Sequence, residues 1–122
     1  MYVLLNQGRE TVAYIETNMI VEAGQTGLIG VMLGNCLFDK SGRLAGKFFG
    51  GKVYNLKGEQ IADAIIADSA ADISFQRHLE EASDIAYSIA DHADVWIEPT
   101  GKWSREKLTE LLAVREKAFA RV

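Results

Sequence analysis

Few residues in this chain of 122 have the types and spacing that catalysis or metal binding needs. The two histidines, His78 and His92, are fourteen positions apart. On one helix that separation corresponds to roughly 21 Å, so the pair cannot bind one metal ion together. No serine lies in the G-x-S-x-G pattern of a nucleophilic serine. We therefore expect no metal, no cofactor and no catalytic residue, and the sequence favours a protein that is not an enzyme.

Two other features resemble reactive or phosphate-binding elements but have simpler structural interpretations. Cys36 is the only cysteine, so the chain cannot form an internal disulfide and implies no oxidising compartment. It lies in an apolar run, which is typical of a small buried side chain. The glycine-rich run 24–30 lacks the Lys-Ser/Thr ending of a P-loop and leads into a predicted strand. Neither feature predicts a reactive thiol or a nucleotide site.

Charge is distributed unevenly along the chain, whose formal net charge is -4. Residues 67–98 carry eight acidic side chains and one basic side chain, whereas residues 102–122 carry six basic and three acidic ones. The asymmetry predicts attraction between two neighbouring elements, within one chain or between two chains. The acidic balance argues against nucleic-acid binding. The cations available for that role would be Lys102, Arg105, Lys107, Arg115, Lys117 and Arg121.

The beginning of the chain shows no targeting signal. Residues 1–6 lack a basic region, and their apolar run is too short for a signal peptide. No window approaches the ~20 apolar residues of a membrane span. We expect a cytoplasmic protein that does not bind a membrane.

The first half of the chain repeats a short unit four times. In the two clearest copies, residues 37–46 and 53–62, an aliphatic and an aromatic residue precede Asp39 or Asn55, and a glycine follows three positions later. Asp or Asn starts a tight turn by accepting backbone hydrogen bonds, and glycine supplies the left-handed backbone that closes it. The turn glycines, separated by 16, 18 and 16 residues, are Gly8, Gly24, Gly42 and Gly58.

Each unit therefore predicts a β-hairpin. The runs that flank the turns are short and rich in β-branched and aromatic residues, as strands are. One hairpin cannot bury its own apolar face, but four in series can do so if they curl around one another. We expect residues 1–66 to form one domain, an antiparallel meander of four hairpins with about eight short strands.

The hairpin repeats resemble the four-fold β-flower domain, a small bacterial fold of four hairpins around a pseudo-four-fold axis. The resemblance covers residues 1 to about 64, and residues 19–34 depart from its pattern. It implies the fold and carries no catalytic residue. The matching residues are Val12-Ala13-Tyr14, Leu37-Phe38-Asp39 to Gly42, and Val53-Tyr54-Asn55 to Gly58.

The second half, residues 67–122, predicts two amphipathic helices, which places the chain in the α+β class with strands first and helices after them. Ser69 and Asp72 form a capping pair before the first helix. Apolar residues then recur at steps of three and four, which is one face of a helix. They are Phe75, Leu79, Ala82, Ala86, Ile89 and Ala93, widened by Ile85.

The last helix is predicted at 105–121, after a break that contains the only proline, Pro99. Ser104 is its predicted N-cap, and Trp103 and Leu108 are placed for a hydrophobic staple. The two helices could pack on the hairpin domain or pair with the helices of a second copy. The apolar stripe of the last helix is Leu108, Leu111, Leu112, Ala118, Phe119 and Val122.

These features favour a protein-interaction or self-assembly module without enzymatic activity, joined to a copy of itself or to another protein through its C-terminal helices. The residues expected at that interface are Trp96, Trp103, Leu108, Leu112 and Phe119. The alternative is a small-ligand-binding protein or small enzyme, with its site at the centre of the hairpin ring or beneath the helices. Its polar groups would come from the turn residues Asn6, Asn35, Asp39 and Asn55.

Overall fold

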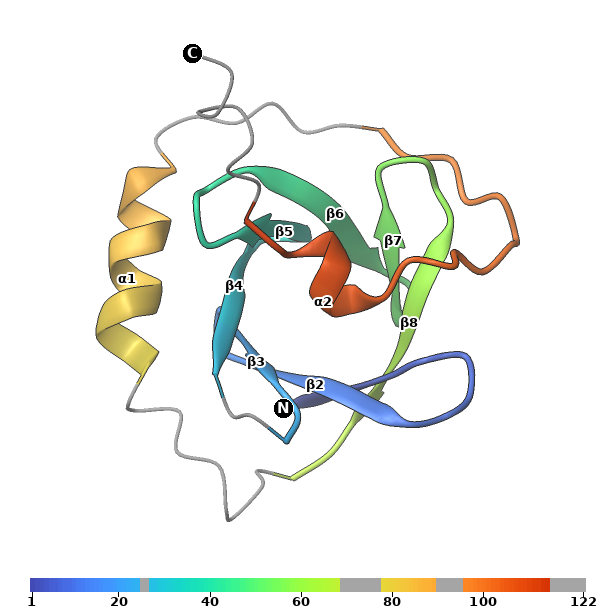
Figure 1. The fold of residues 1–122 in the computed structure, drawn as a ribbon, viewed down its shortest axis with the longest axis horizontal. Coiled ribbons are helices and arrows are strands. Elements are labelled where there is room, and N and C mark those ends of the chain that lie inside the picture. The colour runs from blue at the N-terminus through green and yellow to red at the C-terminus, as the bar shows by residue number, and fades with distance from the viewer. Residues whose placement is uncertain (25–26, 69–77, 90–95, 115–122) are drawn as a thin grey trace.

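Eight antiparallel strands close into a barrel in the computed structural model of the chain (Figure 1), which describes residues 1–24, 27–68, 78–89 and 96–114. Each strand pairs with the next, and β1 pairs with β8 to close the barrel. The predicted antiparallel meander of hairpins is confirmed, and closure leaves no free edge. The strands are β1 (Tyr2–Leu5), β2 (Thr11–Glu16), β3 (Met19–Glu22), β4 (Leu28–Leu33), β5 (Cys36–Asp39), β6 (Leu44–Phe49), β7 (Lys52–Asn55) and β8 (Gln60–Ile66).

Three hairpin turns have the same geometry, as their shared Asp or Asn predicts. In the β7–β8 turn, Oδ1 of Asn55 accepts hydrogen bonds from the backbone N–H groups two and four positions later, at 3.0 and 2.9 Å. Asp39 makes the equivalent two bonds in the β5–β6 turn. Asn6 makes the second of them in the β1–β2 turn. A side-chain acceptor thus starts each of these turns and fixes its shape.

The first turn differs from the prediction in the position of its left-handed residue. Gly42 and Gly58 have φ angles of 87° and 83°, as predicted for turn-closing glycines. In the first turn the left-handed residue is Arg9, with a φ of 67°, and not Gly8. The prediction for Gly8 was wrong by one position. The turn begins at Asn6, and the third residue after Asn6 is Arg9.

The barrel interior alternates large and small side chains around its circumference. In each hairpin a large aliphatic residue on the first strand pairs with Ala or Gly on the second. A Cβ atom at Gly30 or Gly46 would meet a backbone carbonyl of the neighbouring strand, so glycine permits the close approach there. The four pairs are Leu4–Ala13, Ile20–Gly30, Leu37–Gly46 and Val53–Ala62.

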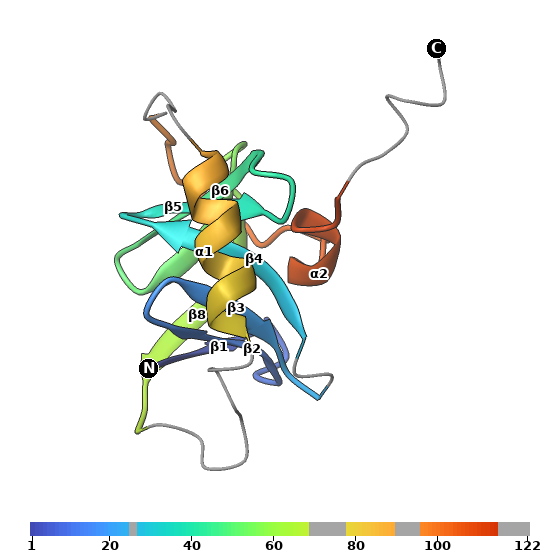
Figure 2. The same cartoon turned by 90° about the vertical axis from the view of Figure 1, so that its left-hand side faces the viewer.

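A short helix, α2 (Leu108–Leu111), closes one end of the barrel, as the two perpendicular views in Figures 1 and 2 show. Leu108, Leu111 and Leu112 are buried in the same apolar cluster as the large residues of the strands. Their side chains therefore occupy the axis of the hairpin ring, which is filled with apolar groups.

The helix predicted at 105–121 is much shorter than expected. It begins at Leu108 and ends at Leu111, and the described residues after it are not helical. Its N-cap is Lys107 and not Ser104, whose hydroxyl instead accepts a hydrogen bond from the backbone of Glu106 at 3.0 Å. So short a helix is unstable alone. Packing of its leucines into the barrel end sets its length, and the 3.6-residue periodicity of the sequence does not.

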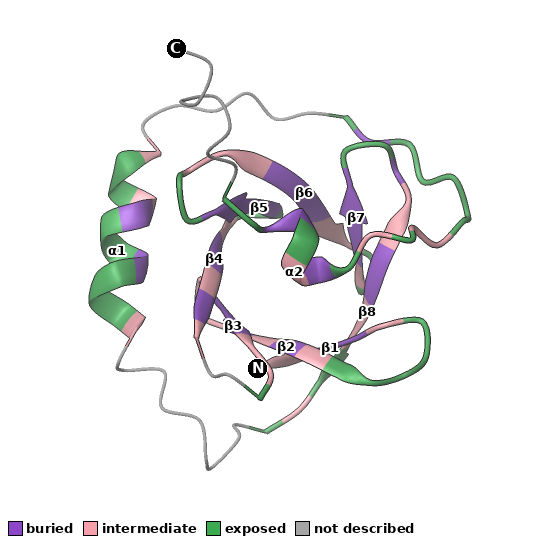
Figure 3. Cartoon of the chain, viewed as in Figure 1, coloured by how far each residue is buried: buried purple, intermediate pink, exposed green. Residues whose placement is uncertain are grey.

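The other helix, α1 (Leu79–Ser88), lies on the outside of the barrel along β4 (Figures 2 and 3). Ala82 and Ile85 are buried against outward side chains of β3 to β5, as the predicted stripe requires, whereas Leu79 is exposed. Among the described residues, no helix has the length and apolar character to cross a membrane. The predicted capping pair and ends of this helix lie outside the described residues, namely Ser69, Asp72, Phe75 and Ala93.

Candidate functional site at the rim of the barrel

The rim is the end of the barrel that carries α2 and the β1–β2, β5–β6 and β7–β8 turns. Residues 97–104, which we call the strap, pass outside the β7–β8 turn, bend at Gly101 and lead back to α2 (Figure 1). The backbone N–H of Gln60 donates to the carbonyl of Lys102 at 2.8 Å, and the N–H of Ser104 donates to the carbonyl of Gln60 at 2.8 Å. The strap therefore pairs with the start of β8 and delivers α2 to the mouth of the barrel.

Glycine at position 58 allows the strap to lie against the β7–β8 turn. The carbonyl of Gly58 accepts a hydrogen bond from the backbone N–H of Thr100 at 3.0 Å. A Cβ atom on Gly58 would collide with the backbone carbonyl of Glu98. The residue that closes the turn thus also creates room for the strap.

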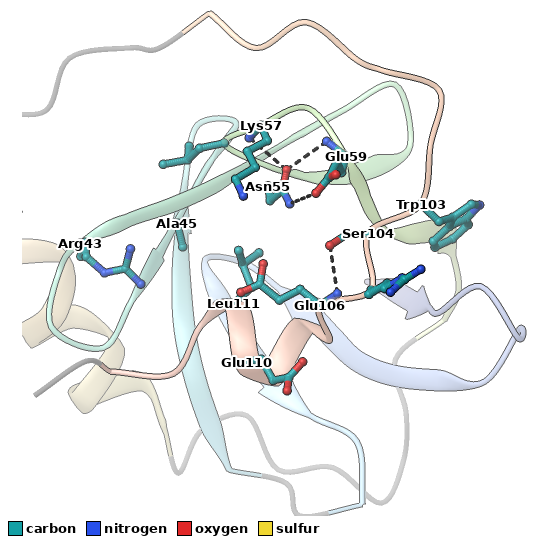
Figure 4. Close-up of a pocket in the computed structure, with 12 residues that line it drawn as sticks. Arg43, Ala45, Asn55, Lys57, Glu59, Trp103, Ser104, Glu106, Glu110 and Leu111 are labelled. Atoms are coloured by element: carbon teal, nitrogen blue, oxygen red, sulfur yellow. Dashed lines mark hydrogen bonds between the residues drawn. The ribbon is translucent and has the colours of Figure 1, made fainter. Parts of the chain in front are cut away.

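The rim groove is a cavity of about 960 Å³ between the β5–β6 and β7–β8 turns on one side and the strap and α2 on the other. Figure 4 shows Arg43 and Trp103 on opposite sides of the groove, with Leu111 and Glu106 between them. The groove is lined by Arg43, Ala45, Asn55, Leu56, Lys57, Glu59, Trp103, Ser104, Arg105, Glu106, Glu110 and Leu111. Apolar side chains and both signs of charge therefore surround one hollow.

A second groove of about 460 Å³ lies beside the first, between the β1–β2 turn and α2. The two grooves share the wall from Trp103 to Glu106, which is the end of the strap and the residues after it. Its remaining polar lining includes Asn6 and Glu10 of the first turn. The two hollows thus follow the rim on either side of this shared wall.

One of the three rim turns has an Asp and Arg pair where the other two have an Asn and Glu pair. In the β1–β2 and β7–β8 turns, the Asn amide donates a hydrogen bond to a Glu four positions later, Asn6 to Glu10 at 3.1 Å and Asn55 to Glu59 at 3.0 Å. In the β5–β6 turn the pair is Asp39 and Arg43, and Nε of Arg43 donates to Oδ2 of Asp39 at 3.1 Å. The same turn geometry therefore presents a guanidinium where its sisters present a carboxylate.

The cations and carboxylates of the rim groove differ in the partners that they have within the described residues. Nη2 of Arg43 is buried and has no hydrogen-bond partner in the part of the chain that the structure describes. In the same described part, neither Lys57 nor Arg105 has an ion-pair partner. The carboxylates Glu59 and Glu110 each accept a hydrogen bond from a neutral group. Three cations and three carboxylates, Glu106 among the latter, therefore line the groove.

The structure brings together three of the four predicted turn residues. Asn6, Asp39 and Asn55 all lie at the rim, where their side chains hold the turns. Asn35 lies in the β4–β5 turn at the opposite end of the barrel, where its Oδ1 is 3.6 Å from Sγ of Cys36. Asp39 is fully buried and does not line the groove, but it forms an ion pair with Arg43, which does.

The residues predicted to bind a partner lie in different surroundings. Trp96 is 82% exposed, and Trp103 is half-buried in the wall that both grooves share. Leu108 and Leu112 are each 3% exposed because they pack into the barrel end. Phe119 lies outside the described residues. Among the described members of this set, Trp96 is the most exposed.

The candidate ligand-binding cations Arg43, Lys57 and Arg105 were not singled out together by the sequence. A signal for Arg43 does exist, because the turn reads D-K-S-G-R where its sister reads N-L-K-G-E. Within the described residues, no group of three His, Cys, Asp or Glu side chains is placed to hold a metal ion. His78 is the N-cap of α1, and His92 lies outside those residues.

The fold and the rim together define a closed eight-stranded antiparallel barrel whose mouth is closed by a short helix, which a strap paired with β8 leads to. Comparisons of the chain with known protein families, with curated proteins and with solved structures gave no match.

Proposed function

We propose that the chain is a non-enzymatic binding module that holds a small ligand in the rim groove. The observation that carries the proposal is a hollow of about 960 Å³ whose walls are fixed by hydrogen-bonded turns and whose lining combines apolar side chains with charged groups. Ligand sites are concave, and a few polar groups in them orient the ligand. The non-enzymatic part rests on the sequence, in which no nucleophile–base pattern occurs.

A fragment screen followed by two-dimensional NMR of the ¹⁵N-labelled chain tests this function. Ligands are expected to shift the backbone amide of Lys57 and the indole N–H of Trp103, which line the groove from opposite sides. The variant Trp103→Ala removes one wall and is expected to weaken binding about tenfold. The variant Trp96→Ala is the matched control, since this tryptophan does not line the groove. Equal losses in the two variants, or shifts scattered over the barrel, would contradict the proposal.

A second candidate function is protein interaction or self-assembly, which the exposed aromatic residues favour. Tyr87 on α1 is 88% exposed and Trp96 is 82% exposed, and tryptophan and tyrosine are enriched at interface hot spots. Native mass spectrometry is expected to give a multiple of the subunit mass or a captured partner. The variants Tyr87→Ala and Trp96→Ala would then return the chain to a monomer. A monomer at every concentration, with no partner captured, removes this candidate.

Membership of the four-fold β-flower family is likewise a proposal. It is supported by the four large–small residue pairs and by the three equivalent Asx turns, which repeat around the barrel. The family relation implies no activity, so it leaves the two candidate functions as they stand.

A further inference from the structure

The β5–β6 turn breaks the internal symmetry of the rim in a way that folding does not require. Its two sisters use the Asn and Glu pair and reach the same backbone geometry. The chain could therefore build this turn with the same neutral donor and carboxylate. It instead places Asp39 and Arg43 there, which leaves a guanidinium facing the rim groove.

Arg43 is held in place before any ligand arrives. Asp39 is fully buried and accepts hydrogen bonds from two backbone N–H groups and from the hydroxyl of Ser41, so its carboxylate has one orientation. That carboxylate binds Nε of Arg43 and leaves the two terminal nitrogens. A fixed guanidinium loses less conformational entropy when it binds, and a guanidinium N–H can donate to carboxylate or phosphate oxygens.

The remaining groups of the groove supply two more cations beside the carboxylates Glu59, Glu106 and Glu110. Lys57 lies in the neighbouring turn, and Arg105 lies in the opposite wall. Leu111, Ala45 and the half-buried Trp103 supply apolar surface beside the cations. A ligand with an anionic group and an apolar part fits both kinds of lining.

We infer that the rim groove binds a small organic anion, whose carboxylate or phosphate group is held by Arg43 with Lys57 and Arg105. This inference rests on the proposed binding function and names the ligand class. Asp39 acts as a positioning residue, because it contacts Arg43 and is itself buried away from the groove.

NMR titrations of the full chain with sodium phosphate and with sodium acetate, at constant ionic strength set by sodium chloride, test the inference. Either anion is expected to shift signals of Arg43, Lys57 and Arg105 in a saturable way. Stronger binding of phosphate indicates a phosphorylated ligand, and stronger binding of acetate indicates a carboxylic acid. Equal, non-saturating shifts with both anions and with chloride overturn the inference.

The double variant Asp39→Asn/Arg43→Glu tests the role of Arg43 directly. It gives this turn the Asn and Glu pair of the other two rim turns and is therefore expected to fold. Anion binding is expected to weaken about tenfold or more in this variant, as loss of a hydrogen bond to a charged group predicts. Arg43→Lys keeps the charge and should show intermediate binding. Arg9→Gln removes a rim cation that does not line either groove and should bind as the parent does. Undiminished binding by the double variant overturns the role of Arg43.

Failure of this inference can be distinguished from failure of the proposed function. If neutral or cationic fragments shift Lys57 and Trp103 while anions do not, the groove binds ligands and the anion class is wrong. If neither fragments nor anions bind in the groove, both are wrong.

Discussion

At the scale of single residues, the left-handed position of each rim turn shows how the turn constrains its sequence. Three residues after the Asx residue, the backbone takes a positive φ in all three equivalent turns, at Arg9, Gly42 and Gly58. A side chain with a Cβ atom is strained there, whereas glycine is not. Arg9 therefore carries a strain that its two glycine counterparts avoid.

We predict that Arg9→Gly is more stable than Arg9→Ala by about 1 kcal/mol, since both variants lose the side chain and only glycine relieves the strained φ. Both lose the ion pair between Arg9 and Asp63, whose nitrogen and oxygen lie 3.0 Å apart. Its loss therefore cancels in the comparison. Urea denaturation of the two variants measures the difference. An alanine variant as stable as the glycine variant would show that this position is not strained in solution.

The strap gives a second residue-scale prediction, based on two glycines with nearly the same backbone. A Cβ atom at Gly42 would reach Ile89 and Ser88 at 3.4 Å, whereas one at Gly58 would collide with the carbonyl of Glu98. Gly42→Ala should cost about 1–2 kcal/mol for the strained φ alone. Gly58→Ala should lower the free energy of unfolding by about 1–3 kcal/mol more than Gly42→Ala does, because the strap must shift.

Hydrogen exchange identifies which part of the molecule responds to these two alanines. Gly58→Ala is expected to speed exchange of the amide protons that join strap and barrel, those of Gln60, Thr100 and Ser104. Gly42→Ala should leave their exchange unchanged. Equal free-energy losses, together with equal exchange at these amides, would show that the strap does not depend on glycine at position 58.

At the scale of elements, the sequence predicts the strands and the buried stripe of α1 well and the extent of α2 poorly, for a physical reason. A hairpin is specified by local signals, the Asx residue, the glycine and alternating side chains. The extent of α2 is decided elsewhere, because Leu108, Leu111 and Leu112 are satisfied by the barrel mouth after four helical residues. Within the described residues 105–114, the 3.6-residue period thus predicted the buried positions Leu108, Leu111 and Leu112 correctly and the extent of the helix incorrectly.

The candidate site was predictable only in part for the same reason. Asn6, Asp39 and Asn55 were found because their turn signal is local, and they prove to lie on one rim. Asn35 has a similar residue type but belongs to a turn at the other end. The groove also needs Trp103 and Arg105, which the strap brings to the β7–β8 turn from more than forty residues further along the chain. No local pattern specifies that contact.

At the scale of the whole molecule, closure explains why small residues recur at one level of the barrel. Ala13, Gly30, Gly46 and Ala62 pair with large residues of the preceding strands and leave space beneath α2. The side chains of Leu111 and Leu112 lie 3.4 Å from where Cβ atoms of Gly46 and Gly30 would be. The barrel core is therefore complete only when the leucines from the second half of the chain are in place.

This dependence predicts that a fragment ending at Asp68 lacks a complete core, although it contains all eight strands. Each buried leucine removed from a core costs about 2–5 kcal/mol, and a domain of this size has about 5–15 kcal/mol in total. Loss of three leucines should therefore abolish cooperative unfolding in urea and expose an apolar mouth that binds the dye ANS.

The full-length variant with Leu108, Leu111 and Leu112 changed to serine keeps α1 and the strap residues. It should reproduce the loss, which assigns the effect to the barrel mouth. A fragment that unfolds cooperatively, within about 1 kcal/mol of the full chain, would show that the hairpins alone form a sufficient core.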